Sequence, residues 1–95
     1  MNISILGTGN MAAGLAVLFA KASHTVTLGS RDAEKAKVVA SKIGNGITGA
    51  ELAEAARKAD LVVLAVKPQM MDAVLPELAR FVATDTLVLS IAAGK

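Results

Sequence analysis

A glycine-rich run between a strand pattern and a helix pattern sets strong limits on the fold of this chain. Residues 2–6 read Asn-Ile-Ser-Ile-Leu, which favours a β-strand, and the run Gly7-Thr8-Gly9-Asn10-Met11-Ala12 follows at once. Residues 10–22 then repeat apolar side chains near helical spacing. A strand, a glycine turn and a helix in this order open a βαβ unit, so the sequence favours an α/β fold.

The rest of the chain repeats this alternation of short apolar runs with longer helical patterns. The sequence predicts further strands at 25–28, 46–49, 61–66 and 86–91, and further helices at 32–43, 51–59 and 69–82. Helical crossovers between strands imply parallel pairing and right-handed connections. We therefore expect an α/β fold of the Rossmann type, with a doubly wound parallel sheet of about five strands in the order 3-2-1-4-5. Residues 1–95 would form a single three-layer domain.

The glycine run has the form G-x-G-x-x-A, in which each small residue has a separate task. Gly7 allows the tight turn out of the strand, and Gly9 leaves the backbone open to a pyrophosphate. Ala12 and Gly14 let the helix lie close to the sheet, and the N–H groups of its first turn then point at the phosphates. The residues that we expect to bind a dinucleotide here are Gly7, Thr8, Gly9, Asn10 and Met11. The alternative is a glycine turn that binds no ligand.

The end of the second predicted strand bears on the choice between NAD and NADP. A domain specific for NAD places an acidic residue there, which accepts a hydrogen bond from the ribose 2′-OH. This chain reads Leu28-Gly29-Ser30-Arg31 instead, and Lys35 follows four residues after Arg31, so on a helix these two cations share a face. Ser30, Arg31 and Lys35 would form a pocket for a 2′-phosphate, of which arginine can bind two oxygens. We therefore predict that the cofactor is NADP.

A purely structural explanation of the same residues stays open. Ser30 or Asp32 can cap the second helix, and Asp32 can pair with Lys35. Arg31 and Lys35 can then be solvated surface residues. The lack of an acid at the strand end also argues against a methyltransferase, because Asp32 is expected too late in the chain, inside the helix.

The ends of the fourth and fifth predicted strands are rich in small residues. The fourth ends in Ala65-Val66-Lys67-Pro68 and the fifth in Ser90-Ile91-Ala92-Ala93-Gly94. Ligands of open parallel sheets lie at the carboxyl ends of the strands. The residues that we expect beside the nicotinamide half of the cofactor are Val66, Lys67, Pro68, Ala92 and Ala93. The alternative is a solvated lysine at 67 and a plain loop at the end of the chain.

Composition narrows the remaining function classes. The net charge is +2 with interspersed signs, and aromatic residues make up 2%, so we expect no nucleic-acid partner. The chain has no cysteine and a single histidine, His24, so we expect no metal site and leave the catalytic residues unassigned. No apolar run reaches the roughly 18 residues of a membrane span, so we expect no membrane partner and a cytoplasmic location. Residues 86–91 would form an uncovered sheet edge, and we expect self-association there or through the helix at 69–82.

Together these runs resemble known reductase families over essentially the whole chain. Gly7-Thr8-Gly9-Asn10-Met11-Ala12, Leu64-Ala65-Val66-Lys67-Pro68-Gln69 and Leu89-Ser90-Ile91-Ala92-Ala93-Gly94 are similar to the N-terminal domain of pyrroline-5-carboxylate reductase. The run Gly29-Ser30-Arg31-Asp32-Ala33-Glu34-Lys35-Ala36 resembles the NADP reductases that use a deazaflavin coenzyme. The resemblance implies an NADP(H)-binding oxidoreductase domain, which in the first family serves the NADPH-dependent reduction of a cyclic imine. It also implies that the residues near the 2′-phosphate are Thr8, Ser30, Arg31 and Lys35.

Two departures from the resemblance limit what it implies. Pyrroline-5-carboxylate reductases usually carry an asparagine at the start of the third helix, where this chain reads Gly49-Ala50-Glu51-Leu52. They also continue into a helical domain that dimerises and completes the substrate pocket, and this chain ends where that domain would begin. We therefore expect binding of the dinucleotide but an incomplete catalyst. The alternative is a stand-alone or excised binding module that has no catalysis of its own.

Overall fold

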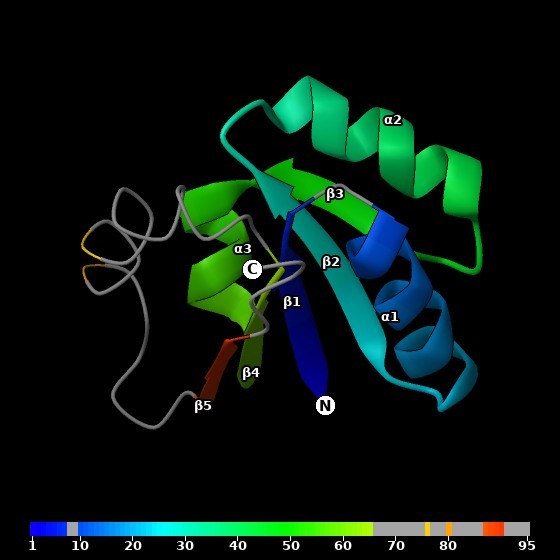
Figure 1. Cartoon of the computed structure of the whole chain (residues 1–95), viewed down its shortest axis with the longest axis horizontal. Helices are drawn as coiled ribbons and strands as arrows, with labels where there is room; N and C mark the ends of the chain where they lie inside the picture. The colour runs from blue at the N-terminus through cyan, green and yellow to red at the C-terminus, as the bar shows by residue number, and fades with distance from the viewer. Residues whose placement is uncertain (8–9, 66–75, 77–79, 81–86, 91–95) are drawn as a thin grey trace.

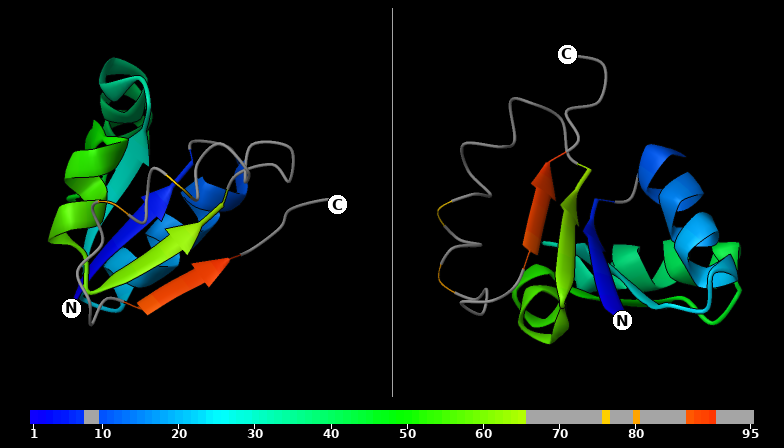
Figure 2. Two further views of the ribbon diagram at one scale, coloured as in Figure 1. Left: turned by 90° about the vertical axis from the view of Figure 1, so that its left-hand side faces the viewer. Right: turned by 90° about the horizontal axis from the view of Figure 1, so that it is seen from below.

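A computed structural model describes residues 1–7, 10–65, 76, 80 and 87–90 of the chain. Its sheet is built from the strands β1 (Asn2–Leu6), β2 (Thr25–Ser30), β3 (Thr48–Glu51), β4 (Leu61–Leu64) and β5 (Leu87–Ser90). All neighbouring pairs are parallel, in the order β3-β2-β1-β4-β5 (Figure 1). This order confirms the predicted doubly wound sheet, and the strands point the same way, so their carboxyl ends share one edge (Figure 2).

Three described helices cover the two faces of the sheet: α1 (Asn10–Lys21), α2 (Ala33–Ile43) and α3 (Leu52–Lys58). Alternate residues of β1 belong to different cores, because neighbouring side chains of a strand point to opposite faces. Ile3 and Ile5 pack with residues of α1 and α2, whereas Leu6 packs with residues of α3. The three-layer arrangement was predicted from the alternation of strands and helices. The predicted helix at 69–82 lies outside the described residues, apart from positions 76 and 80.

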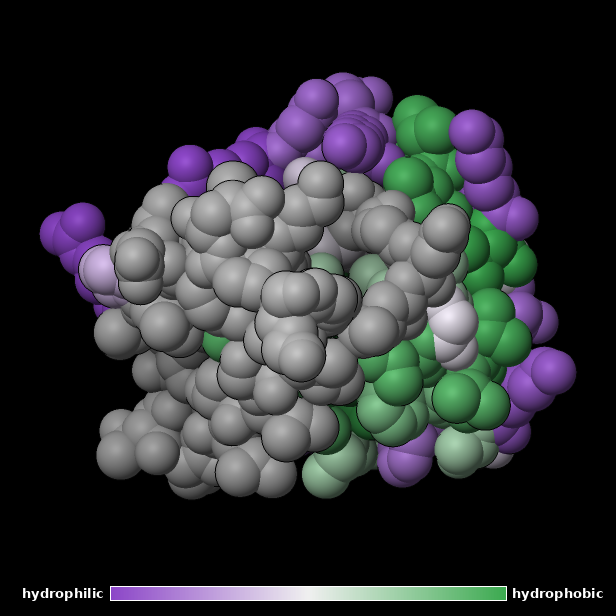
Figure 3. Space-filling model, viewed as in Figure 1, coloured by the Kyte–Doolittle hydropathy of each residue, from purple (hydrophilic) through white to green (hydrophobic). Residues whose placement is uncertain are grey.

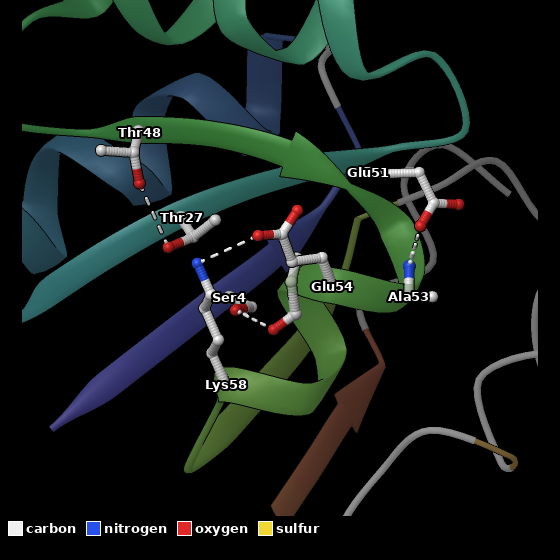
Figure 4. Close-up of polar contacts among 8 residues, drawn as sticks. Ser4, Thr27, Thr48, Glu51, Ala53, Glu54 and Lys58 are labelled. Atoms are coloured by element: carbon white, nitrogen blue, oxygen red, sulfur yellow. Dashed lines mark hydrogen bonds and ion pairs between the residues drawn. The ribbon is translucent and has the colours of Figure 1, made fainter.

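Strand β4, which lies between β1 and β5, is buried on both faces, as its apolar run predicts. Val62 and Leu64 belong to the core beneath α3, and Val63 belongs to the core beneath α1 and α2. On the α3 side the hydroxyl of Ser4 donates a hydrogen bond of 2.6 Å to the carbonyl oxygen of Ala55, which ties α3 to β1 (Figure 4). The buried serine is therefore satisfied, and its role here is structural.

The packing of α1 corrects one expectation from the glycine run. Ala12 and Ala16 are fully buried against the sheet, one helical turn apart. Gly14 is exposed, and a Cβ added to it would meet nothing within 4 Å, so it is not needed for close packing. The outer side of α1 is nevertheless apolar: Leu18 is 64% exposed, and Figure 3 shows apolar side chains gathered on the side of the molecule that α1 forms.

The element bounds differ from the predicted ones mainly around β2 and β3. Strand β2 continues to Ser30, two residues beyond the predicted end, because its last residues pair with β3. Strand β3 occupies Thr48–Glu51 instead of residues 46–49. The shift follows from the turn before it, in which Gly44 and Gly46 have φ of 76° and Asn45 has φ of 58°. Gly44 ends α2, as the sequence predicts, and its N–H donates to the carbonyl oxygen of Ala40.

Candidate functional site

The carboxyl ends of the strands form one continuous edge of the sheet. Leu6 of β1 lies opposite Gly29 of β2 on one side and Leu64 of β4 on the other. On the far side of β4, Leu64 lies opposite Ser90. The chain therefore leaves these strands at the same level. Strand ends that are as far apart in the sequence as Leu6 and Ser90 therefore lie along the one edge where the sequence predicts the site.

The turn after β1 has a geometry that only glycine satisfies. Gly7 has φ of 140°, and its N–H donates to the carbonyl oxygen of Gly29 at 2.9 Å. A Cβ at this position would lie 2.5 Å from the carbonyl oxygen of Ala65 in the neighbouring strand connection. Both the backbone angle and the space exclude a side chain. The turn lies at the predicted place, and the next two residues of the run, Thr8 and Gly9, lie outside the described residues.

Helix α1 starts at this edge, and its first turn differs in charge from those of the other two helices. Asp32 caps α2 and Glu34 follows in its first turn, while Glu51 caps α3 and is followed by Glu54. The first turn of α1 contains no acidic residue. No carboxylate of its own first turn therefore neutralises the positive end of the α1 dipole. An exposed positive end suits an anionic ligand at the start of the helix. Asn10 and Met11 begin this helix, and their side chains lie outside the described part of the chain.

At the end of β2 the structure brings Ser30 to the same edge. Ser30 is half-buried, and its Oγ accepts a hydrogen bond from the N–H of Asp32 at 3.2 Å. An accepting hydroxyl still carries its own proton, which a phosphate oxygen can accept. Leu6 lies opposite Gly29, so the next residues, Gly7 and Ser30, are at the same level. Ser30 therefore ends the strand that neighbours the glycine turn.

Asp32 has the capping role that the sequence left open. Its Oδ1 accepts from the N–H of Glu34 at 3.1 Å and from that of Lys35 at 3.3 Å. Arg31 and Lys35 are both exposed. Since α2 begins at Ala33, Arg31 lies before the helix, and the helical spacing that grouped it with Lys35 does not apply. The two cations flank the capping turn instead, next to Ser30 in the sequence.

The remaining predicted site residues are not described. The predicted contacts that lie outside the described residues are Thr8, Gly9, Val66, Lys67, Pro68, Ala92 and Ala93. What the structure does place is the chain directly before residue 66 and the end of β5. Ala65 donates its N–H to the carbonyl oxygen of Leu6 at 2.9 Å, directly before residue 66, and Ser90 ends β5 at the same edge.

Sequence reasoning missed one charged residue at this edge, Glu51. It ends β3 opposite Ser30 of β2 and caps α3 by accepting from the N–H of Ala53 at 3.0 Å. The sequence signal was an acidic residue at the first position of the helix predicted at 51–59. That signal predicts a cap, but it does not reveal which strand the residue faces.

Among the described residues, His24 lies away from the candidate site. The ring of His24 packs edge-on against Phe19 at 6.5 Å between centroids, and Thr25 next to it bonds to Met1, at the opposite edge of the sheet. Within the described ranges, no three acidic, histidine or cysteine side chains lie close enough together to hold a metal ion. No helix in the described part of the chain is long and apolar enough to cross a membrane.

Comparison with known proteins extends the resemblance seen in the sequence. Residues 2–94 match the family described as NADP oxidoreductase, coenzyme F420-dependent. The chain is 44% identical over 77 residues to the F420-dependent NADP reductase of Methanothermobacter thermautotrophicus, a match that covers 73% of this chain and 33% of that protein. It is 39% identical over 95 residues to the pyrroline-5-carboxylate reductase of Pseudomonas aeruginosa, a match that covers 97% of this chain and 34% of that protein. The chain thus spans about a third of the length of these relatives.

The fold is shared with solved oxidoreductase structures. The 3-hydroxyisobutyrate dehydrogenase of Mycobacterium tuberculosis superposes with a TM-score of 0.80 at 23% identity, over 96% of this chain and 31% of that one. This likeness supports the Rossmann-type architecture, which the strand order also gives. The expected family resemblance is therefore confirmed both for F420-dependent NADP reductase and for pyrroline-5-carboxylate reductase.

Proposed function

We propose that this chain, which belongs to the family of coenzyme F420-dependent NADP oxidoreductases, binds NADP(H) as the cofactor domain of an oxidoreductase. The observation that carries the choice of NADP is the end of β2, where Ser30 lies on the strand next to the Gly7 turn and Arg31 follows it in the chain. A hydroxyl and a guanidinium suit a 2′-phosphate, and the nearby Asp32 is engaged in capping α2. When bound, the dinucleotide supplies hydride transfer, and the protein binds and orients it.

Each part of the edge has a task in this proposal. The turn at Gly7 lets the backbone approach the pyrophosphate, and the N–H groups at the start of α1 face its charge. The hydroxyl of Ser30 donates to an oxygen of the 2′-phosphate, Arg31 binds two of its oxygens, and Lys35 adds a second positive charge. The other predicted contacts, which stay part of this proposal, are Thr8, Gly9, Asn10, Met11, Val66, Lys67, Pro68, Ala92 and Ala93.

The substrate of the whole protein is a separate proposal. The relatives are about three times as long as this chain, and we propose that residues beyond those described here bind the second substrate. The names of the two relatives support coenzyme F420 and a cyclic imine as the candidates. The alternative is a dinucleotide-binding module without catalysis. Steady turnover of a cyclic imine by the 95-residue chain, linear in protein concentration, would exclude that alternative.

Titration of the chain with NADPH and NADH tests the cofactor. We expect NADPH to bind at least tenfold more tightly, and equal or tighter binding of NADH would refute the choice of NADP. Arg31→Ala removes a charged hydrogen-bonding group, which is worth about a tenfold to hundredfold loss of NADPH affinity, and it should leave NADH binding nearly unchanged. Lys42→Ala is the matched control, because it removes one positive charge from the last turn of α2, away from the edge.

A further inference from the structure

Glu51 brings a carboxylate to the strand end next to the predicted phosphate pocket. The register of β2 and β3 sets Ser30 opposite Glu51, and neighbouring strands lie about 4.8 Å apart. Glu51 is half-buried and ends its strand at the same sheet edge as Ser30. Figure 4 shows it at the junction of β3 and α3, where the strand gives way to the helix.

Capping α3 uses only part of the hydrogen-bonding capacity of this carboxylate. The N–H of Ala53 donates a hydrogen bond of 3.0 Å to Oε1 of Glu51. An ionised carboxylate has two oxygens and about four acceptor sites, so Oε2 can accept from a ligand hydroxyl while Oε1 holds the cap. A ribose hydroxyl is such a donor, and a phosphate is not.

We propose that Glu51 is a specificity-determining residue of this site, whose carboxylate accepts a hydroxyl of the adenine-side ribose and repels a 2′-phosphate. The inference rests on the proposed dinucleotide binding. In Rossmann-type folds the ribose lies at the end of the second strand, where a carboxylate favours the 2′-OH of NAD. Here the carboxylate belongs to the last residue of the next strand, whose backbone pairs with Ser30. The chain therefore binds NAD(H) as well as NADP(H), with a smaller preference than Ser30, Arg31 and Lys35 would give without it.

Glu51→Gln tests the role of the charge, because the amide oxygen of glutamine can still accept from Ala53 while the negative charge is lost. The measurements are the dissociation constants of NADPH and NADH with the 95-residue chain at low and high salt. One carboxylate charge about 8 Å from one phosphate charge weakens binding by about two- to thirtyfold, for an effective dielectric constant between about 80 and about 20. The variant should bind NADPH more tightly by that factor and NADH more weakly. The gain for NADPH should shrink in high salt, because salt screens the repulsion.

Two further variants keep the test interpretable. Glu54→Gln removes the same charge from the first turn of α3, at an exposed side chain that pairs with Lys58 at 3.3 Å. This variant should leave the ratio of the NADPH and NADH dissociation constants unchanged. Glu51→Asn is neutral and provides a favoured capping side chain, so it should shift the ratio in the same direction even if the glutamine variant folds poorly. Thermal unfolding of each variant identifies loss of structure.

The outcomes separate the inference from the function on which it rests. If the unmodified chain binds neither dinucleotide, the proposed function fails. If it prefers NADPH and Arg31→Ala removes that preference, the function stands. If both Glu51 variants then keep the ratio of the unmodified chain, or shift it no more than Glu54→Gln does, the role of Glu51 is overturned.

Discussion

Replacing Gly7 with alanine tests whether the turn after β1 is as constrained as its geometry indicates. The added Cβ would lie 2.5 Å from the carbonyl oxygen of Ala65, a backbone atom that also belongs to the sheet edge. Neither partner can rotate away, because Gly7 donates to Gly29 and Ala65 donates to Leu6. The residue would also have to keep φ of 140°, which alanine rarely adopts.

The size of the effect follows from these two terms. An unfavourable backbone conformation costs about 1–3 kcal/mol, and forcing an atom into a packed region costs about 1–3 kcal/mol more. We expect Gly7→Ala to lower the free energy of unfolding by about 2–6 kcal/mol, the sum of these terms. The stability of a domain of this size is about 5–14 kcal/mol at the usual value per residue, so the loss is a large part of the total.

Urea denaturation followed by circular dichroism measures this loss as a fall in the midpoint at an unchanged slope. Gly14→Ala is the control, because Gly14 lies in the middle of α1 with nothing within 4 Å of an added Cβ. That variant should be more stable by about 0.5–1 kcal/mol, since alanine favours the helix over glycine. If Gly7→Ala lay within 1 kcal/mol of the unmodified chain, or if both variants behaved alike, the steric argument about the turn would be wrong.

Two other predictions concern the cap of α2 and the edge of the sheet. Asp32→Ala should lower the free energy of unfolding by about 1 kcal/mol, because the N–H groups of Glu34 and Lys35 lose their acceptor. Asp32→Asn should keep most of the stability, because asparagine also caps helices well. Chemical denaturation of both variants side by side checks this, and equal losses would show that the cap is not the cause. Strand β5 is an edge strand of the sheet, so we expect the chain to self-associate there, and a sedimentation coefficient independent of concentration would contradict this.

Local patterns in the sequence were enough to predict most of the architecture. The bounds of β1 and the position of the glycine turn follow from residues that are neighbours in the chain, and the apolar run of β4 predicts burial on both faces. The strand order follows from general rules for parallel sheets joined by helices. The end of α2 at Gly44 was also predictable, because a helix that stops at glycine has a local signature.

Details that depend on pairing between distant residues could not be predicted. The sequence left Ser30 in a loop, whereas the structure extends β2 to it because β3 offers backbone partners 21 residues further along the chain. The helical grouping of Arg31 with Lys35 also failed, because the cap at Asp32 starts α2 after Arg31. Both differences arise where a cap or a neighbouring strand decides the conformation of a few residues.

By itself the sequence determined that the chain forms a doubly wound sheet with a glycine turn at the carboxyl end of its first strand. It also determined which cations and hydroxyls follow the second strand. The pairing of Glu51 with Ser30 at this edge comes from the tertiary structure alone. The physical reason is that residue types and their spacing encode local elements, whereas strand register depends on the length of the turn between α2 and β3. That turn, with Gly44, Asn45 and Gly46 at positive φ, shifts β3 by two residues from the predicted 46–49 and so sets the partner of Ser30.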